Sequence, residues 1–242
     1  IEALDPTVTV RSAAPYDQPA ITAASFRGVA GVCFTGSGDP WSPDAAEAAP
    51  QYLAMRAALD SGVPVYGSCF GMQLAAVVLG GEVGACPNGL ECGVVAIGPT
   101  AAGRDHPMLA GRGDGFTAPC VHRDDVRTLP PGTVLLAANA HTGVQAFATT
   151  AASGCDFWGS QYHPELSAAD VAEIVRGAAT PEVFGPALPL AGLLEAADTD
   201  AAAAAELGTT VEALALLPRA TELRNWLRHV RARHTAGRRI SN

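Results

Sequence analysis

Short apolar runs alternate with longer amphipathic stretches over the first two thirds of the chain. Val29–Thr35 and Val63–Tyr66 are short, mostly apolar and flanked by glycine, which predicts buried strands. Ala45–Ser61 lies between them, has the length of a helix and stops before Gly62. Because strand, helix and strand follow one another in this way, we expect an α/β fold with an open, mostly parallel sheet flanked by helices.

The rest of the chain adds further strands and then a run of helices. After Pro164 the sequence becomes rich in alanine, which favours helices. The additional expected strands are Thr7–Val10, Val94–Ile97, Val134–Ala138, Gly143–Ala148 and Phe157–Gln161, and the additional expected helices are Cys69–Leu79, Ala168–Arg176, Leu188–Ala205 and Thr221–Arg233. We therefore divide the chain into one domain at residues 1–178 and a helical extension at residues 179–242 that packs on the same domain.

Composition indicates a folded domain without a membrane anchor. The 242 residues are 48% hydrophobic, which is enough to form a core. No stretch approaches the roughly 20 consecutive apolar residues of a membrane helix, and Ile1–Val10 lacks the basic and then apolar layout of a secretory signal. We expect a cytoplasmic protein with no membrane partner. The formal net charge of −9 also argues against nucleic acid as a partner, because phosphate binding needs a positive field.

All fifteen basic residues are arginine. The absence of lysine excludes Schiff-base chemistry and the lysine of a phosphate-binding loop. Seven of the arginines crowd the C-terminal end of the chain, at Arg219, Arg224, Arg228, Arg231, Arg233, Arg238 and Arg239. This cluster indicates either a solvated helical face or a docking surface for an acidic partner.

Six cysteines are scattered without the spacing of a disulfide-rich scaffold or a zinc site, at Cys33, Cys69, Cys86, Cys92, Cys120 and Cys155. We interpret them as reduced thiols, most of them small core residues. Cys86 and Cys92 lack the second pair that would complete a tetrahedral site, so we expect no metal there. No cofactor is predicted.

The sequence Gly67-Ser68-Cys69-Phe70-Gly71 has the form G-x-C-x-G between a predicted strand and a predicted helix. This is the form of a nucleophile elbow with cysteine in place of serine. Glycines two positions either side avoid a collision with the neighbouring strand and helix, and the helix N-terminus favours a thiolate. The backbone N–H of Phe70 is then a natural donor to an oxyanion. The alternative is that Cys69 is a small buried residue beside a glycine-rich turn.

A base and a group to orient it occur together in Gln161-Tyr162-His163-Pro164-Glu165. Pro164 prevents helix formation and favours an extended His163, so the side chains of His163 and Glu165 can point the same way. A carboxylate beside an imidazole fixes its tautomer and stabilises the imidazolium. Together with Cys69, these residues form a candidate catalytic set of nucleophile, base and orienting group. The other histidines of interest, His106, His141, His229 and His234, are interpreted as structural.

A glycine-containing loop, Thr35-Gly36-Ser37-Gly38-Asp39-Pro40, follows the strand at Val29–Thr35. Its glycines permit backbone N–H groups to face a bound oxyanion. Ligands of open α/β sheets bind at the carboxyl ends of the strands, where this loop and the Cys69 elbow are both expected to lie. An ordinary turn between a strand and a helix would have the same composition.

Four segments of the chain resemble the class I, triad-type glutamine amidotransferases. TGSGDP resembles the oxyanion loop of that family, PVYGSCFGMQLAAVVLGGEV its nucleophile segment and FWGSQYHPE its histidine–glutamate segment. His122-Arg123-Asp124, followed by VRTLPPGTVLLAANAHTGVQAF, is similar to a stretch of the branch that includes the GMP synthetase glutaminase domain and its free-standing relatives. The resemblance covers about residues 29–170 and implies the flavodoxin-like fold of the family.

This resemblance implies a cysteine-dependent glutaminase. Cys69 would form a γ-glutamyl thioester and release ammonia, and His163 would carry protons while water hydrolyses the thioester. No part of the chain resembles an ATP-binding synthetase domain, so a separate synthetase or acceptor-binding protein is the expected partner.

The resemblance also implies roles for residues around the nucleophile. The oxyanion would be held by the N–H of Phe70 and by one from Gly36 or Ser37. Gln73 would help to bind the substrate glutamine. His122 and Asp124 are interpreted first as structural residues.

Two other functions stay open. The same thioester chemistry cleaves γ-glutamyl bonds in peptides or glutathione conjugates, so a γ-glutamyl peptidase is the alternative enzyme. A non-catalytic binding or regulatory module is the alternative from another class. The intact set of Cys69, His163 and Glu165 argues against that module.

The two ends of the chain depart from the family pattern. The family fold normally begins with a strand and a helix before the segment that Thr7–Val10 resembles. We therefore expect the full protein to be longer than this chain. Beyond about residue 178 the resemblance fades, and ATELRNWLRHV is only loosely similar to the C-terminal helix of the free-standing relatives.

Overall fold

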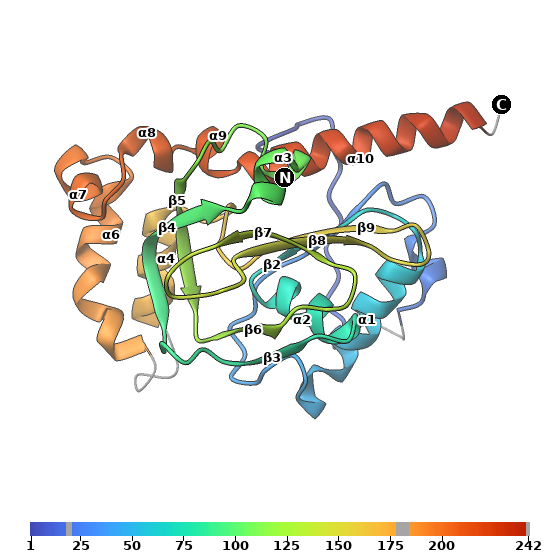
Figure 1. Cartoon of the computed structure of the whole chain (residues 1–242), viewed down its shortest axis with the longest axis horizontal. Coiled ribbons are helices and arrows are strands. Elements are labelled where there is room, and N and C mark those ends of the chain that lie inside the picture. The colour runs from blue at the N-terminus through green and yellow to red at the C-terminus, as the bar shows by residue number, and fades with distance from the viewer. Residues whose placement is uncertain (18–20, 178–183, 241–242) are drawn as a thin grey trace.

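The computed structural model describes residues 1–17, 21–177 and 184–240, with side chains up to residue 236. Its centre is a seven-stranded sheet, with a small two-stranded sheet below it in Figure 1. In spatial order the large sheet consists of β1 (Val32–Phe34), β2 (Val65–Ser68), β9 (Asp156–Ser160), β8 (Ala146–Thr150), β7 (Val134–Ala138), β4 (Glu91–Pro99) and β5 (Phe116–His122). The small sheet pairs β3 (Glu82–Ala85) with β6 (Asp124–Thr128).

Parallel pairing is confined to the part of the sheet that carries Cys69. β1 pairs with β2, and β2 with β9, in parallel. The strands β8, β7, β4 and β5 continue the sheet in antiparallel pairs. Parallel neighbours need a long crossover, which α1 (Ala49–Asp60) provides between β1 and β2, whereas only short loops join β7, β8 and β9. The α/β fold is as expected, but its parallel region is smaller than the sequence indicated.

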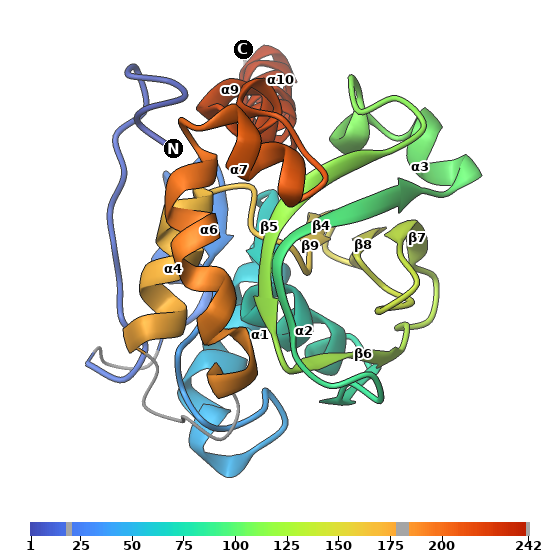
Figure 2. The same cartoon turned by 90° about the vertical axis from the view of Figure 1, so that its left-hand side faces the viewer.

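Helices cover the faces and one end of the large sheet (Figures 1 and 2). Figure 2 shows α4 and α6 standing beside β5, and Figure 1 shows α10 running along the top of the molecule. Besides α1, the described helices are α2 (Phe70–Val78), α3 (Ala101–Asp105), α4 (Ala168–Gly177), α6 (Ala191–Ala197), α7 (Ala201–Glu206), α8 (Val211–Leu214), α9 (Leu216–Arg219) and α10 (Thr221–Ile240). Short 3-10 helices occur at Ala23–Phe26, Ala46–Ala48, Pro107–Leu109 and Gly185–Leu190.

Two hydrophobic layers enclose the parallel strands. Side chains alternate between the faces of a strand, so Val65 and Phe157 point to one face and their neighbours Tyr66 and Trp158 to the other. The first face packs against α1 and α2. The second packs against α10, where Trp226 lies edge-on to Tyr66. Because β2 is buried on both faces, the loop that follows it has a rigid base.

Thr7–Val10 is not a strand, so that expectation was wrong. No described strand pairs with it, and the N–H of Val10 donates to the carboxylate of Glu2 instead. Val8 packs beside the cluster that includes α10. Val10 is exposed, so of the two valines only Val8 contributes to the core, through side-chain packing and not through pairing in a sheet.

The expected helix at Leu188–Ala205 was also wrong, because the structure breaks it into several pieces. Pro189 lies inside the 3-10 helix at Gly185–Leu190. Asp198 ends α6 and accepts hydrogen bonds from the first backbone N–H groups of α4. Asp200 then caps α7. Aspartates favour such caps over helix interiors, which explains the breaks.

The arginines near the C-terminus are used within the chain. Arg231 pairs with Asp5, and Arg233 pairs with Asp156 at 2.7 Å, so α10 is fastened to the N-terminal segment and to β9. Three others, Arg219, Arg224 and Arg228, donate to groups near their own helices. Neither a purely solvated face nor a free docking surface describes these five side chains. The side chains of Arg238 and Arg239 lie outside the described residues.

Two further expectations concern the division of the chain near residue 178 and the absence of a membrane-spanning segment. The boundary near residue 178 lies outside the described residues, so the division into a domain and an extension stays a prediction. Within the described ranges, α4 and α6 pack together in one hydrophobic cluster. None of the helices in those ranges has the length and apolar character needed to cross a membrane.

Candidate active site

Cys69 lies at a sharp turn between β2 and α2. Its φ of 49° is the one positive φ of a non-glycine residue in the described part of the chain. The flanking glycines are sterically required: a Cβ on Gly67 would lie 2.6 Å from the backbone of Gly71, and a Cβ on Gly71 would lie 2.5 Å from the carbonyl oxygen of Phe34. The local geometry is therefore that of a strained nucleophile elbow.

The thiol of Cys69 points into a nearly enclosed polar site. The residue is 8% exposed, and its backbone N–H donates to the carbonyl of Ser160 on the neighbouring strand. The side-chain amide of Gln161 donates to the sulfur at 3.4 Å, and the carbonyl oxygen of Val121 lies 3.8 Å from it. The sulfur also lies at the N-terminus of α2, where the helix dipole favours negative charge.

His163 reaches the site from the loop after β9, the parallel neighbour of β2. Its backbone N–H donates to the carbonyl of Pro119, which fixes the position of the loop. The ring Nδ1 lies 2.8 Å from Oε1 of Glu165. The ring Nε2 is buried and has no hydrogen-bond partner among the described residues. One ring nitrogen is thus held by a carboxylate, and the other is available for proton transfer.

The three predicted side chains affect one another electrostatically. Burial alone would lower the pKa of His163, but the nearby Glu165 carboxylate and the sulfur of Cys69 outweigh burial and hold this pKa well above its usual range. Burial would raise the pKa of Glu165, but the charge of His163 and several hydrogen bonds keep it below its usual value. The favoured state of the pair is therefore an imidazolium beside a carboxylate.

The loop predicted to hold an oxyanion lies against the same residues. A Cβ on Gly36 would lie 3.0 Å from the ring of His163 and 3.7 Å from Cβ of Cys69. The hydroxyl of Ser37 donates to Asp39 within the loop. The first residue of α2, Phe70, follows Cys69 directly. The structure thus brings Gly36 and Phe70 next to Cys69, with Ser37 following Gly36 in the loop, while the role of all three as oxyanion donors stays a prediction.

Further contacts tie this loop to the turn between β5 and β6. Arg123 donates to the carbonyl oxygen of Pro40 at 2.6 Å, and the hydroxyl of Ser42 donates to the carboxylate of Asp124. Asp124 therefore acts as an anchor for the loop, while its interpretation as a structural residue and not a substrate contact stays a prediction.

Gln73 lies on α2, one turn after Cys69, and is 4% exposed. Its amide nitrogen donates to the backbone carbonyl of Asp124 at 2.7 Å and to the side-chain oxygen of Gln161 at 3.0 Å. Since Gln161 in turn donates to the sulfur of Cys69, Gln73 belongs to the polar surroundings of the nucleophile. Its proposed contact with substrate is not tested by these bonds.

Sequence reasoning did not assign three residues that the structure brings into or near the site. Ser68 donates to Glu165, and Gln161 donates to Cys69. Both lie inside the two sequence motifs, Ser68 directly before Cys69 and Gln161 two residues before His163. This closeness in sequence was the signal that could have pointed to them. Glu91 is the third, and no sequence feature connected it with His122.

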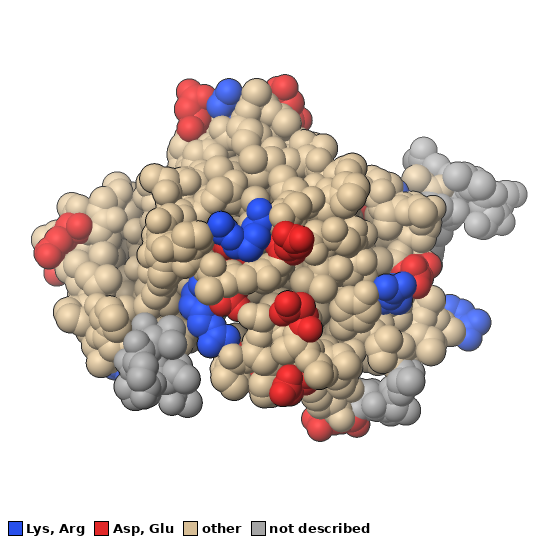
Figure 3. Space-filling model, turned by 60° about the horizontal axis from the view of Figure 1, so that its bottom comes forward, with Lys and Arg blue, Asp and Glu red and all other residues tan. Residues whose placement is uncertain are grey.

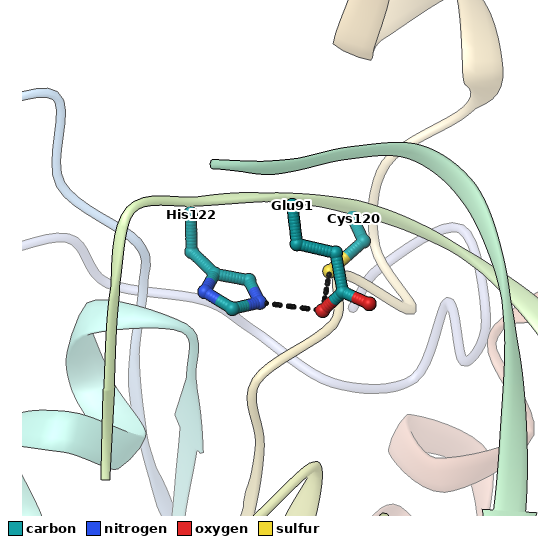
Figure 4. Close-up of side chains that lie close together, drawn as sticks. All are labelled: Glu91, Cys120 and His122. Carbon is teal, nitrogen blue, oxygen red and sulfur yellow. Dashed lines mark hydrogen bonds and ion pairs between the residues drawn. The ribbon is translucent and has the colours of Figure 1, made fainter. Parts of the chain in front are cut away.

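Glu91, Cys120 and His122 form a second buried cluster (Figure 4). Their ligand-type atoms lie within 4.8 Å of one another, which raises the question of a metal site. The Glu91 carboxylate, however, already accepts hydrogen bonds from the side chains of Asn139 and Gln145 and lies 2.8 Å from Nε2 of His122. Burial and the charge of Glu91 hold the pKa of Cys120 well above its usual range. Hydrogen bonds to the carboxylate and a protonated thiol therefore explain this cluster without a metal ion.

A cavity of about 810 Å³ adjoins the loop and the β5–β6 turn. Figure 3 shows the side of the molecule where basic and acidic side chains border a hollow near the middle of the face. The walls of the cavity come from the loop before α1, from the segment between β3 and β4, and from the 3-10 helix near the C-terminal layer, and include Pro40, Ser42, Arg123, Asp124, Ala187 and Leu190.

Comparison with known proteins gives a consistent result. A family model described as glutamine amidotransferase class-I matches residues 13–174. A γ-glutamyl-L-1-hydroxyisopropylamide hydrolase of a Pseudomonas species is 40% identical over 129 residues, which are 50% of this chain and 42% of that protein. A glutamine-hydrolyzing GMP synthase of Thermomicrobium roseum is 32% identical over 163 residues, which are 66% of this chain and 28% of that protein. The chain thus spans less than half the length of either relative.

Among solved structures, a glutamine amido transferase from Methylobacillus flagellatus has a similar fold. The TM-score is 0.54 and the sequence identity is 25%, and the match covers 88% of this chain and 79% of that structure. The similarity therefore extends beyond the residues of the family match and includes much of the C-terminal helical layer.

Proposed function

The chain belongs to the class I glutamine amidotransferases, and from this premise we propose that it hydrolyses the side-chain amide of glutamine through a thioester on Cys69, with His163 and Glu165 as its catalytic partners. The observation that carries the proposal is the juxtaposition at the carboxyl ends of β2 and β9. There, Cys69, with its strained backbone, lies at a helix N-terminus and close enough to His163 to raise the pKa of the ring, whose Nδ1 is bound by Glu165. This is the geometry that cysteine-dependent acyl transfer needs.

The first half of the reaction uses the charges already present. The thiolate of Cys69 attacks the amide carbon, and the N–H of Phe70, with one from Gly36 or Ser37, stabilises the oxyanion that forms. The imidazolium of His163 gives its Nε2 proton to the leaving nitrogen as the carbon–nitrogen bond breaks, and ammonia is released. Glu165 stabilises the imidazolium until that proton leaves.

The second half restores the enzyme. Neutral His163 takes a proton from water as the water attacks the thioester, and the collapse of the second tetrahedral intermediate expels the thiolate and leaves glutamate. The sum is glutamine plus water giving glutamate plus ammonia. In this proposal Gln73 binds the substrate beside the nucleophile.

A partner protein would receive the ammonia. Only 28% of the Thermomicrobium GMP synthase matches this chain, so that protein contains other parts beyond the matched region. We propose that a separate synthetase or acceptor-binding protein supplies the corresponding function here, in the cytoplasm.

A specific observation favours a second candidate function, hydrolysis of a substituted γ-glutamyl amide. The cavity of about 810 Å³ borders Asp124, whose carbonyl is bound by Gln73, and it offers apolar wall residues such as Ala187 and Leu190. Pockets of roughly 300–1,000 Å³ hold ligands well above the size of glutamine. The relative that is 40% identical is named for cleavage of such an amide. The amine would leave in place of ammonia, by the same steps.

One assay separates the two candidates. Purified protein is given glutamine in one series and γ-glutamyl alkylamides of increasing size in another, and released ammonia or amine is measured as kcat/KM. A glutaminase prefers glutamine. A γ-glutamyl amide hydrolase prefers the alkylamides, by about tenfold or more if one buried methylene contributes its usual share. Turnover of neither class, together with an unreactive Cys69, would contradict both and leave the non-catalytic module.

A further inference from the structure

The residue before the nucleophile carries a hydroxyl that reaches the opposite end of the candidate triad. Ser68 is the last residue of β2 and is 4% exposed. Its Oγ donates to Oε1 of Glu165 at 2.7 Å. The same oxygen lies 2.8 Å from Nδ1 of His163. One carboxylate oxygen therefore receives two hydrogen bonds, one from the proposed base and one from the residue next to the proposed nucleophile.

The pairing of the strands sets this geometry. Ser68 lies opposite Ser160 in the parallel pair of β2 and β9. Side chains alternate along a strand, so Ser68 shares a face with Tyr66, whose hydroxyl contacts Ser160. The loop after β9 carries Glu165 back over that face. A polar side chain at position 68 is thus aimed at the carboxylate by the sheet itself.

We propose that Ser68 is a positioning residue for the proposed hydrolysis, and that its hydroxyl holds the Glu165 carboxylate with Oε1 toward Nδ1 of His163. This inference rests on the proposed function. The other oxygen, Oε2 of Glu165, is buried and has no hydrogen-bond partner among the described residues. Without Ser68, His163 would be the one side chain among the described residues that bonds the carboxylate, which could then turn about its side-chain bonds.

The hydroxyl also favours the charged form of the carboxylate. Burial raises the pKa of Glu165. The charge of His163 and the hydrogen bonds from His163 and Ser68 lower it by more, so the net pKa lies below the usual value. A carboxylate that stays charged and aligned supports the imidazolium of His163. Loss of the hydroxyl therefore weakens that support, and His163 gives up its proton at a lower pH.

The test compares variants at position 68 by steady-state hydrolysis of whichever γ-glutamyl substrate the wild type turns over. We expect Ser68→Ala to lower kcat about tenfold, as the loss of one hydrogen bond to a charged group predicts, with KM changed less than about twofold. The alkaline limb of the kcat/KM profile should move to lower pH.

A size-matched pair separates the hydroxyl from packing. Thr and Val have nearly the same shape, and only Thr keeps the donor. We expect Ser68→Thr to retain most of the wild-type kcat and Ser68→Val to lose it as Ser68→Ala does. Ser153→Ala serves as the control, because the Ser153 hydroxyl donates to the carbonyl of Leu59 and accepts from the N–H of Cys155, at the opposite end of β9 from His163. It should leave kcat and the pH profile unchanged.

Several results would overturn the inference. Equal kcat in Ser68→Thr and Ser68→Val would show that the hydroxyl does not matter. A loss of thermal stability in the variants, with kcat and the alkaline limb at wild-type values, would indicate a merely structural serine. The same would follow if Ser68→Ala and Ser68→Val failed to fold while Ser68→Thr folded and was active. A wild type without turnover would defeat the proposed function instead, which keeps the two failures distinct.

Discussion

Two clusters of cysteine, histidine and glutamate occur among the described residues, and they differ in how the three side chains are connected. In the first, the imidazole of His163 lies between the other two, with Glu165 on one nitrogen and Cys69 near the other. In the second, the carboxylate of Glu91 is the centre, and both the thiol of Cys120 and the imidazole of His122 contact it (Figure 4).

This difference determines which imidazole has a ring nitrogen left for the proposed proton transfer. In the second cluster, Nε2 of His122 faces Glu91 and Nδ1 faces the backbone carbonyl of Asp124 at 3.0 Å. Both partners are acceptors, so neither nitrogen is left to take a proton from a thiol. In the first cluster, Nε2 of His163 has no partner among the described residues. The same three residue types therefore leave a ring nitrogen open for the proposed chemistry in one place and occupy both ring nitrogens in the other.

Substitution of the two histidines should give the largest difference in kcat between the two clusters. We expect His163→Asn to lower kcat by about a thousandfold, the usual share of a positioned general acid and base. His122→Asn should lower kcat less than about tenfold but destabilise the fold by about 3 kcal/mol, because it leaves Glu91 buried without one of its partners. Steady-state kinetics and urea unfolding measure the two effects.

The wild type and an unrelated surface variant serve as references for both quantities. Losses of kcat of similar size in the two histidine variants would mean that the second cluster also takes part in the chemistry. The distinction drawn from their hydrogen bonds would then be wrong.

Substitution of the two glutamates should give a smaller loss of kcat, and only one of the two variants should change the pH dependence of kcat/KM. Glu165 raises the pKa of His163, so the imidazolium persists to higher pH. Removing this charge in Glu165→Gln lowers the pKa of His163, and the alkaline limb of kcat/KM should move to lower pH. The loss in kcat should be about a hundredfold, the low end of what a positioned acid and base contributes. Glu91→Gln should leave the limb in place.

The pH profile is measured from pH 5 to 10 for both variants and the wild type. A shift of the alkaline limb to higher pH in Glu165→Gln would contradict the assigned direction of the interaction. An equal shift in Glu91→Gln would show that the two carboxylates act on the same titrating group.

Much of the fold could be predicted because strands and helices follow from short-range patterns. Val134–Ala138 agrees with the expected strand, and the turn at Cys69 agrees with the expected elbow. The pairing direction of β7, β8 and β9 could not be predicted in the same way, since it depends on loop lengths and on which strands become neighbours. The breaks in the helix predicted at Leu188–Ala205 depend on aspartates that cap helices elsewhere in the fold.

The candidate site could be predicted as far as its motifs reach. Cys69, His163 and Glu165 lie in two recognisable segments, and the structure brings them together. Ser68 and Glu91 could not be assigned, because their roles depend on contacts with residues 97 and 31 positions away. A serine before a cysteine, or a glutamate in a β-strand, carries no pattern of its own.

The proposed role of Cys69 is tested by measuring which cysteine reacts with a chloromethyl ketone that mimics glutamine. The protein is treated with a slight excess of the reagent, and all six cysteines are mapped by peptide mass spectrometry. We predict that Cys69 is labelled, that Cys120 is not, and that His163→Asn slows the labelling of Cys69. Labelling of Cys120 in preference to Cys69, or a labelling rate of Cys69 that does not depend on His163, would contradict the proposed roles of Cys69 and His163.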